Sequence, residues 1–388
     1  MEDISEHLFG PVEEIGLLHV PFLRPSLPRA ETLTGYLNEI DASHIYSNFG
    51  PLVSRFERRL IDEWFGHVGH AITVSNATIG LMLAISNVTR RTGGYALMPS
   101  FTFSAAPLAA LWCGLTPYFI DIEPGSWHMD QARLMRAVQE LGEDVAVIVP
   151  YAAFGDDPGL DFYAGLHIQG LPVVIDAASS FGTQGDHLTF GTASPCPVVF
   201  SFHATKPFGI GEGGLIYSSD AQMAAQIRSA SNFGFDDQRE CTLLGMNAKI
   251  SEYTAAIALA GLDMFPRTAD ILFENCRKLK SKISEANLLN CGWQLQQTRS
   301  RTPRHFLSLL CPPGALNRDV ALHLEKHHIQ ARTYFSPACH QQSFFQKSPH
   351  SGLEVTEDIA SRIISLPMWN GIGEDALDRT VEALTTFL

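Results

Sequence analysis

Lysine is absent from the first 205 residues of this 388-residue chain. Arginine outnumbers lysine by about three to one over the whole sequence, so a general preference for arginine accounts for much of this gap. The first lysine, Lys206, nevertheless lies in the most glycine-rich stretch of the chain, VVFSFHATKPFGIGEGGLIYSS (198–219). We therefore treat Lys206 as a candidate for chemistry and ask which other residues support that hypothesis.

The chain also lacks an apolar run near the ~20 residues that cross a bilayer. Its start, MEDISEHLFG, carries acidic residues where a signal peptide carries basic ones. With a formal net charge of −14 and no basic stripe, it lacks the surface that nucleic acid or an anionic membrane attracts. The seven cysteines are scattered without a C-x-x-C pair, which is typical of a reducing compartment. We expect a cytoplasmic protein that binds neither nucleic acid nor membrane and holds no metal.

Short apolar segments recur between residues 70 and 220, each bounded by Gly, Pro, Ser or Asp, as buried strands are. They are HAITVS (70–75), YALMP (95–99), TPYFIDI (116–122), VAVIVPY (145–151), LPVVIDAA (171–178) and PVVFSF (197–202). Apolar residues at helical spacing follow at 78–88 and 130–141. Strands that alternate with helices predict a mostly parallel sheet covered on both faces.

The pattern changes past residue 245. The stretch 248–265 predicts a long helix with Ser251 as its cap, and HFLSLLCPPG and HIQARTYF further on predict strands of a smaller α+β unit. A chain of this length has room for two or three domains of ~100–200 residues. We place a soft boundary near residue 262, between a large domain (1–262, N-terminal segment included) and a small C-terminal domain (263–388).

Gly209, Gly211 and Gly214 spell G-x-G-x-x-G, the fingerprint of dinucleotide-binding folds. That motif needs a strand directly before it and a helix directly after it. Here HATKPF separates the glycines from the preceding strand, and the apolar, strand-like LIYSS follows them. We therefore interpret the match as false and expect the glycines to let the backbone turn tightly beside a bulky group.

A lysine in a loop of glycine, serine and aromatic residues after a buried strand is typical of a residue that forms a Schiff base. Enzymes that use pyridoxal phosphate surround such a lysine with a carboxylate for the pyridine nitrogen, a phosphate site and an aromatic ring over the cofactor. Asp176 ends the predicted strand 171–178, at the sheet edge where ligands collect. A turn or helix-capping role explains Asp176 equally well.

The segment ITVSNATIGLMLA predicts a strand, a small polar loop and a helix. Free N–H groups at the helix start and the hydroxyls of Ser75 and Thr78 suit a phosphate. Taken alone, an ordinary Ser or Asn cap is the more common explanation. Ser201, five residues before Lys206, is a further candidate phosphate ligand. His203 between them is better explained as a structural neighbour than as a base.

Phe101 and Phe103 come directly after the predicted strand 95–99, and strand alternation puts them on one face. Either ring can stack on a flat cofactor or pack in the core, which is individually the commoner role. None of these features is specific by itself, but their order and their placement at strand ends together favour a pyridoxal phosphate site around Lys206.

In that order, the residues resemble those of the DegT/DnrJ/EryC1/StrS family of sugar aminotransferases, which are pyridoxal phosphate enzymes of fold type I. The resemblance covers nearly the whole chain and is most specific in SFHATKPFGIGEGG (201–214) and GMNAKISE (245–252). Further matching stretches are SNFGPLVSRFERRL, VSNATIGLMLA, PSFTFSAA, IDAASSFG, ARTYFSPACH and SRIISLP. It implies an α/β fold: a large domain with a mostly parallel central sheet flanked by helices, plus a smaller C-terminal α+β domain.

The resemblance also implies a role for individual residues. Lys206 would bind the cofactor covalently and move the proton, Asp176 would bind the pyridine nitrogen, and Phe103 would stack on the ring. Ala77, Thr78 and Ser201 would hold the phosphate. Asn247 would reach the phosphate of the neighbouring subunit's cofactor, so that the active protein is a homodimer with shared sites. Lys249, Arg332 and His340 would line the substrate cleft, where cationic side chains would bind the phosphates of a nucleotide diphosphate.

Several residues depart from the family's usual pattern. Ser179, which we keep among the cofactor-binding residues, stands where relatives usually carry Gln or His. Pro207 stands where many carry Asn, and Ala77 where Gly is common. Extra polar residues lie at 183–194. We expect these departures to leave cofactor binding intact and to bear on the identity of the substrate.

The resemblance implies an aminotransferase that moves an amino group from L-glutamate to a nucleotide-linked keto sugar, a dTDP-4-keto-6-deoxyhexose. The mechanism would be ping-pong, with the pyridoxamine form of the cofactor as intermediate. A dehydratase of the same family carries histidine in place of the lysine, so Lys206 argues against one. The alternatives are a sugar dehydratase or an aminocyclitol transaminase on the same scaffold, or a non-catalytic regulatory or binding protein, for which a buried reactive lysine has no benefit.

Overall fold

The computed structural model describes residues 19–89, 93–185 and 189–387. A seven-stranded sheet forms its centre, and the strands lie in the order β3-β2-β4-β5-β6-β7-β1. Single bridges from Ile148 to Val173 and from Tyr151 to Asp176 join its two hydrogen-bonded parts. The strands are β1 (His70–Val74), β2 (Tyr95–Pro99), β3 (Thr116–Ile120), β4 (Val145–Ile148), β5 (Ile175–Asp176), β6 (Val198–Ser201) and β7 (Gly214–Ser218).

Most neighbouring strands of this sheet are parallel. The exception is β7, which runs antiparallel to both β1 and β6. It follows β6 through the loop that carries Lys206, so the chain reverses direction there without a crossover helix. The predicted mostly parallel α/β sheet is confirmed.

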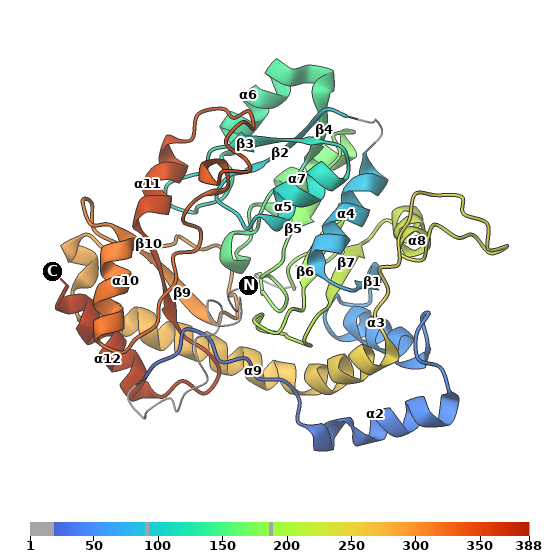
Figure 1. Cartoon of the computed structure of the whole chain (residues 1–388), viewed down its shortest axis with the longest axis horizontal. Helices are drawn as coiled ribbons and strands as arrows, with labels where there is room; N and C mark the ends of the chain where they lie inside the picture. Colours follow the sequence, from blue (N-terminus) through green and yellow to red (C-terminus); the bar gives the residue numbers. More distant parts are fainter. Residues whose placement is uncertain (1–18, 90–92, 186–188, 388) are drawn as a thin grey trace, which may run out of the picture.

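Helices cover both faces of the sheet (Figure 1). The large unit contains α2 (Ala30–Ser43), α3 (Pro51–Glu63), α4 (Ala77–Val88), α5 (Ala105–Trp112), α6 (Gln131–Leu141), α7 (Leu160–Ile168), α8 (Ala221–Ala230) and the first part of α9 (Glu252–Glu285). Within β6, Val198 and Phe200 belong to the hydrophobic cluster beneath α3 and α9, while Val199 belongs to the one beneath α4 and α5. Successive side chains of a strand point to opposite faces of the sheet, and both faces are buried here. The strands are therefore apolar at every position.

The long helix α9 links the sheet to the C-terminal unit along one edge of the molecule (Figure 1). Its cap is Ser251, as predicted: the hydroxyl accepts a hydrogen bond from the backbone N–H of Thr254 at 3.1 Å. The helix continues 20 residues beyond the predicted end at 265, through Pro266. The boundary that we predict at residue 262 falls inside this helix and stays a prediction.

The C-terminal unit has a core of its own, to which Trp293, Leu309 and Ile364 belong. Its antiparallel sheet has the order β10-β9-β8. The elements are β8 (Gln294–Leu295), β9 (Phe306–Leu310), α10 (Asn317–Lys326), α11 (Glu354–Arg362), β10 (Ile363–Pro367) and α12 (Glu374–Thr385). Short 3₁₀ turns lie at Gly142–Asp144, Ala153–Gly155, Leu288–Cys291 and Cys339–Gln341.

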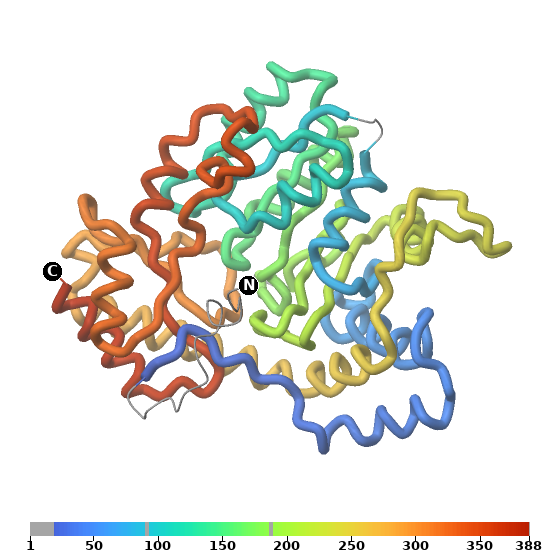
Figure 2. The backbone as a smooth tube through the Cα atoms, in the orientation of Figure 1, coloured from blue at the N-terminus to red at the C-terminus, as the bar shows by residue number. Residues whose placement is uncertain are grey.

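The prediction of a strand at HIQARTYF (328–335) is wrong. Only single bridges form there, from Ile329 to Val20 and from Arg332 to Ser365. The bridge to Val20 brings the start of the described chain onto the C-terminal unit, and Figure 2 shows this segment running beside α9. The N-terminal ten residues, used above against a signal peptide, lie outside the described residues, as does part of the polar stretch 183–194.

The segment after α8 leaves the body of the molecule before it returns to α9 (Figure 2). It carries Leu244, which is 83% exposed, and the exposed Phe233 and Leu243. Such an apolar extension is unusual on a surface that faces water alone. Among the helices that the structure describes, none is long and apolar enough to cross a membrane.

Candidate active site

Lys206, Asp176 and Ser179 meet at the carboxyl ends of β5 and β6. The Nζ atom of Lys206 donates a hydrogen bond to the Oγ atom of Ser179 at 3.0 Å. Asp176 is 3% exposed and is the last residue of β5, and its carboxylate accepts the backbone N–H of Ala178 at 3.1 Å. The structure therefore brings together the lysine and the carboxylate that the sequence singles out, with Ser179 in contact with the amine.

Burial shifts the pKa values of both charged groups. It raises the pKa of the Asp176 carboxyl to about 6, against the opposing effects of the Ala178 N–H and the Lys206 charge. It lowers the pKa of the Lys206 amine, which the charge of Asp176 opposes. The charge of each group favours the ionised form of the other. The loss of hydration on burial, which favours the neutral forms, is nevertheless the larger effect on both pKa values. A lysine whose neutral form is made accessible in this way is suited to act as a nucleophile and as a base.

The backbone around Lys206 is held by hydrogen bonds within its loop. The N–H of Lys206 bonds to the carbonyl of His203 at 2.8 Å, and the N–H of Ala204 bonds to the carbonyl of Gly211 at 2.7 Å. Gly211 has a φ of 94°, a conformation that glycine adopts without strain. The strand β7, not a helix, follows these glycines, so the rejection of the dinucleotide fingerprint is confirmed.

The start of α4 has the form of an anion site. Asn76 is the cap, and its side chain accepts the N–H of Ile79 at 2.9 Å. Among the described residues, the N–H groups of Ala77 and Thr78 donate no hydrogen bond. The two roles that the sequence leaves open are therefore both present: Asn76 caps the helix, and two N–H groups stay available for a ligand.

Gly214 connects this helix start with Ser201. It lies opposite Ser201 in the pairing of β6 with β7. A Cβ atom on Gly214 would come within 2.9 Å of the backbone nitrogen of Ala77. The hydroxyl of Ser201, itself an acceptor for the N–H of His203 at 3.3 Å, thus lies beside the free N–H groups of α4. The three residues predicted to hold a phosphate occupy one region.

The two candidate aromatic residues have different surroundings. Strand β2 ends at Pro99, so strand alternation does not extend to them. Phe101 is fully buried, whereas Phe103 is 61% exposed. Phe101 nevertheless lies near the same residue as Phe103, with its ring centroid 5.6 Å from that of Phe335, and Phe103 is the ring left open to a ligand. Its ring centroid lies 6.4 Å from that of Phe335.

His340 and Arg332 lie on the side of the site formed by the C-terminal unit. The Nδ1 atom of His340 is 2.7 Å from the Oγ atom of Ser100, in the loop that carries Phe103, and its Nε2 atom is 3.3 Å from Glu357. Burial lowers the pKa of His340, against the effect of Glu357. The guanidinium of Arg332 bonds only to the neighbouring carbonyl of Ala331, at 3.1 Å, within the described residues.

Asn247 and Lys249 form a separate group beside the protruding segment. The amine of Lys249 donates to the Oδ1 atom of Asn232 at 2.6 Å and lies 4.9 Å from the centroid of the Phe233 ring. Asn247 is exposed and its backbone pairs with Asn232. No hydrogen bond or ring contact joins either side chain to Lys206 within the described chain. Ala248, which lies between them, accepts the N–H of Ser75, just before α4, at 2.6 Å.

Tyr151 is a residue of this site that the sequence analysis does not single out. Its backbone pairs with Asp176, its ring centroid is 5.8 Å from that of Phe335, and its hydroxyl accepts the N–H of Phe154 at 3.1 Å. Burial raises its pKa, which the Ser179 hydroxyl opposes. The available signal was a tyrosine at the carboxyl end of the predicted strand 145–151, next to the strand of Asp176.

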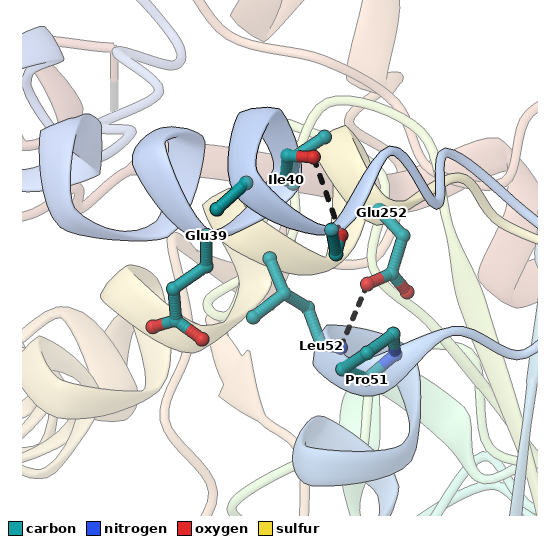
Figure 3. A pocket seen from close by; sticks show the side chains of 7 residues that line it. Glu39, Ile40, Pro51, Leu52 and Glu252 are labelled. Atoms are coloured by element: carbon teal, nitrogen blue, oxygen red, sulfur yellow. Dashed lines mark hydrogen bonds between the residues drawn. The ribbon is translucent and has the colours of Figure 1, made fainter.

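A cavity of about 330 Å³ lies elsewhere, between α2, α3 and α9 (Figure 3). None of the predicted site residues lines it. Its buried carboxylate, Glu252, accepts the N–H groups of Leu52 and Val53 at 2.8 and 3.0 Å and so serves the start of α3. Within the described residues, no group of His, Cys, Asp and Glu could hold a metal ion.

Comparison with known proteins places the chain among aminotransferases. The model of the DegT/DnrJ/EryC1/StrS aminotransferase family matches residues 29–385. A solved structure described as a putative PLP-dependent aminotransferase from Bacillus cereus is 45% identical, has a TM-score of 0.93, and is matched over 94% of this chain and 99% of its own. That of DesI with its TDP-sugar product is 32% identical, with a TM-score of 0.84, over 95% of this chain and 93% of its own.

The curated relatives cover several nucleotide sugars. Protein Rv3402c of Mycobacterium tuberculosis, whose name gives no activity, is 34% identical over 94% of this chain and 89% of its own. Relatives at 26–28% identity, each matched over at least 90% of both chains, carry names that specify a nucleotide sugar. They are dTDP-4-amino-4,6-dideoxy-D-glucose transaminase of Shigella dysenteriae, a UDP-N-acetyl-3-dehydro-glucosamine 3-aminotransferase of Acidithiobacillus ferrooxidans and GDP-perosamine synthase of Vibrio cholerae.

Proposed function

The chain belongs to the DegT/DnrJ/EryC1/StrS aminotransferase family, and from that membership we propose that it aminates a nucleotide-linked keto sugar with pyridoxal phosphate as its cofactor. The amino donor is L-glutamate and the mechanism is ping-pong. The observation that carries the proposal is the contact of the Lys206 amine with Ser179 at 3.0 Å beside the buried carboxylate of Asp176.

The residues of the site fit pyridoxal phosphate. When bound, the cofactor draws electrons from the carbon at which substrate protons are moved. The amine of Lys206 would remove and return that proton, and burial shifts its pKa downward, in the direction that favours the neutral form this role needs. Asp176 would bind the pyridine nitrogen and hold a proton on it. The exposed ring of Phe103 is free to stack, which fixes the orientation of the cofactor.

The free N–H groups of Ala77 and Thr78 and the hydroxyl of Ser201 would hold the phosphate. Asn76 takes over the capping of α4, so these donors need no partner from the protein. A phosphate at the start of a 12-residue helix also gains from the positive end of the helix dipole. The close approach of Gly214 to Ala77 leaves room for no side chain between Ser201 and the helix.

We propose a dTDP-4-keto-6-deoxyhexose as the acceptor. The 32% identity to DesI, which was solved with its TDP-sugar product, supports this choice over the UDP and GDP sugars of the less similar relatives. Arg332, His340 and Lys249 would supply the groups that contact the nucleotide diphosphate, although Lys249 pairs with Asn232 in the single subunit. Arg332 has donors to spare, because its guanidinium uses only the Ala331 carbonyl within the described residues.

The active form is a homodimer in which Asn247 serves the phosphate site of the neighbouring subunit. Support comes from its exposed side chain and from the apolar segment beside it, which protrudes from the subunit (Figure 2). Burial of Leu244 and its exposed apolar neighbours against a second copy would remove from water a surface that a monomer rarely shows.

Reduction of the loaded enzyme with borohydride, followed by peptide mapping, tests the covalent role of Lys206. We expect the pyridoxyl group on the peptide that contains Lys206 and no label in the Lys206→Ala variant. Since no lysine precedes Lys206, and Lys249 is the next one along the chain, the assignment is unambiguous. A label confined to Lys249, or none at all, would refute the proposed function.

A screen of nucleotide-linked keto sugars with L-glutamate then identifies the acceptor. We expect 2-oxoglutarate and an amino sugar to form in equal amounts, with a dTDP-linked 4-keto sugar giving the highest kcat/KM. Loss of a hydroxyl without incorporation of nitrogen would instead identify the dehydratase, and amination of a cyclic ketone without nucleotide would identify the aminocyclitol transaminase. A protein that binds these sugars without converting any of them would be the non-catalytic alternative.

A further inference from the structure

The peptide bond that joins Thr205 to Lys206 is held from both sides. Its N–H, which belongs to Lys206, bonds to the carbonyl of His203 at 2.8 Å. Its carbonyl, which belongs to Thr205, lies 3.3 Å from the Nδ1 atom of His305. Because the peptide group is planar, two hydrogen bonds at its opposite ends fix the orientation of the whole plane. The position of the Cα atom of Lys206 follows from that orientation.

The hydrogen bond from His305 has a defined donor. A carbonyl oxygen only accepts, so the hydrogen must be on Nδ1 of the imidazole. His305 is 6% exposed, and its burial lowers its pKa to about 4, against the effect of the Thr205 carbonyl and with a smaller contribution from the charge of Lys206. The ring is therefore neutral at physiological pH, and its single N–H is the one that points at the Thr205 carbonyl.

His305 reaches this peptide from the C-terminal unit. It directly precedes β9, and its own carbonyl accepts the N–H of Met368 at 3.0 Å, next to the pairing of Phe306 with Pro367. The pairing of β9 with β10 thus fixes the backbone that carries the imidazole, which lies 100 residues from Thr205 in the sequence. A hydrogen bond of this kind lets one unit set the geometry of a loop in the other.

We propose that His305 is a positioning residue: its Nδ1–H holds the peptide before Lys206 and thereby sets where the Lys206 amine lies relative to Ser179 and Asp176. This inference rests on the proposed function, because it assigns His305 to the same reaction. It does not make His305 a catalytic residue, since its one hydrogen bond goes to the backbone. The chain has no second donor to the Thr205 carbonyl within the described residues.

Three substitutions separate positioning from mere packing. Asn carries an N–H on the atom bonded to Cγ, where Nδ1 of histidine lies, whereas Gln carries it one bond further out and Leu carries none. We expect His305→Leu and His305→Gln to lower kcat by about 10- to 100-fold, since small displacements of a reacting group cost rates of that order. His305→Asn should recover most of that loss, and the KM for the amino donor should change less than kcat.

Hydrogen exchange in the cofactor-free protein gives a readout that does not depend on activity. The Lys206 amide should exchange faster in His305→Leu than in the wild type, because the peptide can rotate once its carbonyl is released. His323→Leu is the matched control. It removes another bond between an imidazole and a carbonyl in the C-terminal unit, from His323 Nε2 to Ala383 at 2.9 Å, and should leave both kcat and Lys206 exchange unchanged.

The proposal is overturned if His305→Asn loses as much activity as His305→Gln, or if His305→Leu keeps the wild-type kcat and the wild-type exchange rate at Lys206. Failure of the proposed function looks different: wild-type enzyme would take no pyridoxyl label at Lys206. In that case the exchange rates alone decide whether His305 holds the peptide. Should His305→Leu fail to fold, the comparison of Asn with Gln still decides between positioning and packing.

Discussion

At the scale of single residues, the ionised carboxyl of Asp176 lowers the stability of the folded protein because it is buried. Its pKa is raised to about 6 by burial, while in the unfolded chain it titrates near ~4. Between these values the folded state binds more protons, so this group lowers the free energy of unfolding as the pH rises from 4 to 6. Asn has nearly the same shape and no charge. We expect Asp176→Asn to raise the free energy of unfolding at neutral pH by up to ~3 kcal/mol while removing the activity.

Urea denaturation of the cofactor-free protein at pH ~4.5 and pH ~8 measures this effect. The difference between Asp176→Asn and the wild type should be small at the lower pH and largest at the higher one. Asp237→Asn, at an exposed aspartate on the segment after α8, is the matched control. An equal difference at both pH values would mean that the charge of Asp176 is not the origin of the cost.

The sequence identifies Lys206 and Asp176 because each lies at or just after the end of an apolar strand rich in β-branched residues. The ends of such strands can be predicted from composition. It does not separate Phe101 from Phe103, since that distinction depends on the point at which β2 ends and the chain bends. It does not pair Lys206 with Ser179 either. The contact joins two loops 27 residues apart, and their approach depends on how the whole sheet is assembled.

At the scale of secondary structure elements, the contact of β7 with the start of α4 depends on one glycine. A Cβ atom on Gly214 would lie 2.9 Å from the nitrogen of Ala77 and 3.0 Å from the carbonyl oxygen of Phe200. Both are backbone atoms, so they cannot move without shifting a helix or a strand. We expect Gly214→Ala to cost about 1–3 kcal/mol of stability and to weaken the binding of pyridoxal phosphate, because the N–H donors of α4 are displaced.

Gly165→Ala in α7 is the control, since nothing lies within 4 Å of its added Cβ atom. It should stabilise the protein by about 0.5–1 kcal/mol and leave cofactor binding unchanged. Urea denaturation and titration of the apoprotein with pyridoxal phosphate measure the two effects. The steric argument fails if Gly214→Ala binds the cofactor as tightly as Gly165→Ala does.

Strand and helix positions follow well from the sequence where periodicity is strong. The segments predicted at 70–75, 95–99 and 197–202 contain β1, β2 and β6. The prediction for α9 ends at 265, directly before Pro266, although the helix continues to Glu285. Proline usually ends a helix, but the packing of α9 against both units outweighs that preference. The apolar residues at 328–335 were mistaken for a strand because their pattern does not show that they pair through single bridges only.

At the scale of the whole molecule, the contacts that sequence reasoning cannot supply are those between distant segments. Val20 belongs to the core of the C-terminal unit, although 309 residues separate it from its bridge partner Ile329. Glu252 of α9 serves the start of α3, 200 residues earlier (Figure 3). No local pattern encodes such pairs. The assignment of Asn247 to the neighbouring subunit is a claim of the same long-range kind, and it can be tested without a structure of the dimer.

Mixed dimers of Lys206→Ala and Asn247→Ala test that assignment. Each variant alone should be nearly inactive, because every site lacks one of the two groups. If Asn247 serves the neighbouring site, a mixed dimer has one site with both residues intact and one with both replaced. Random exchange makes about half of the dimers mixed, so an equimolar mixture should recover about a quarter of the wild-type activity. If Asn247 served its own subunit, each site of the mixed dimer would lack one group, and the mixture would be no more active than its components.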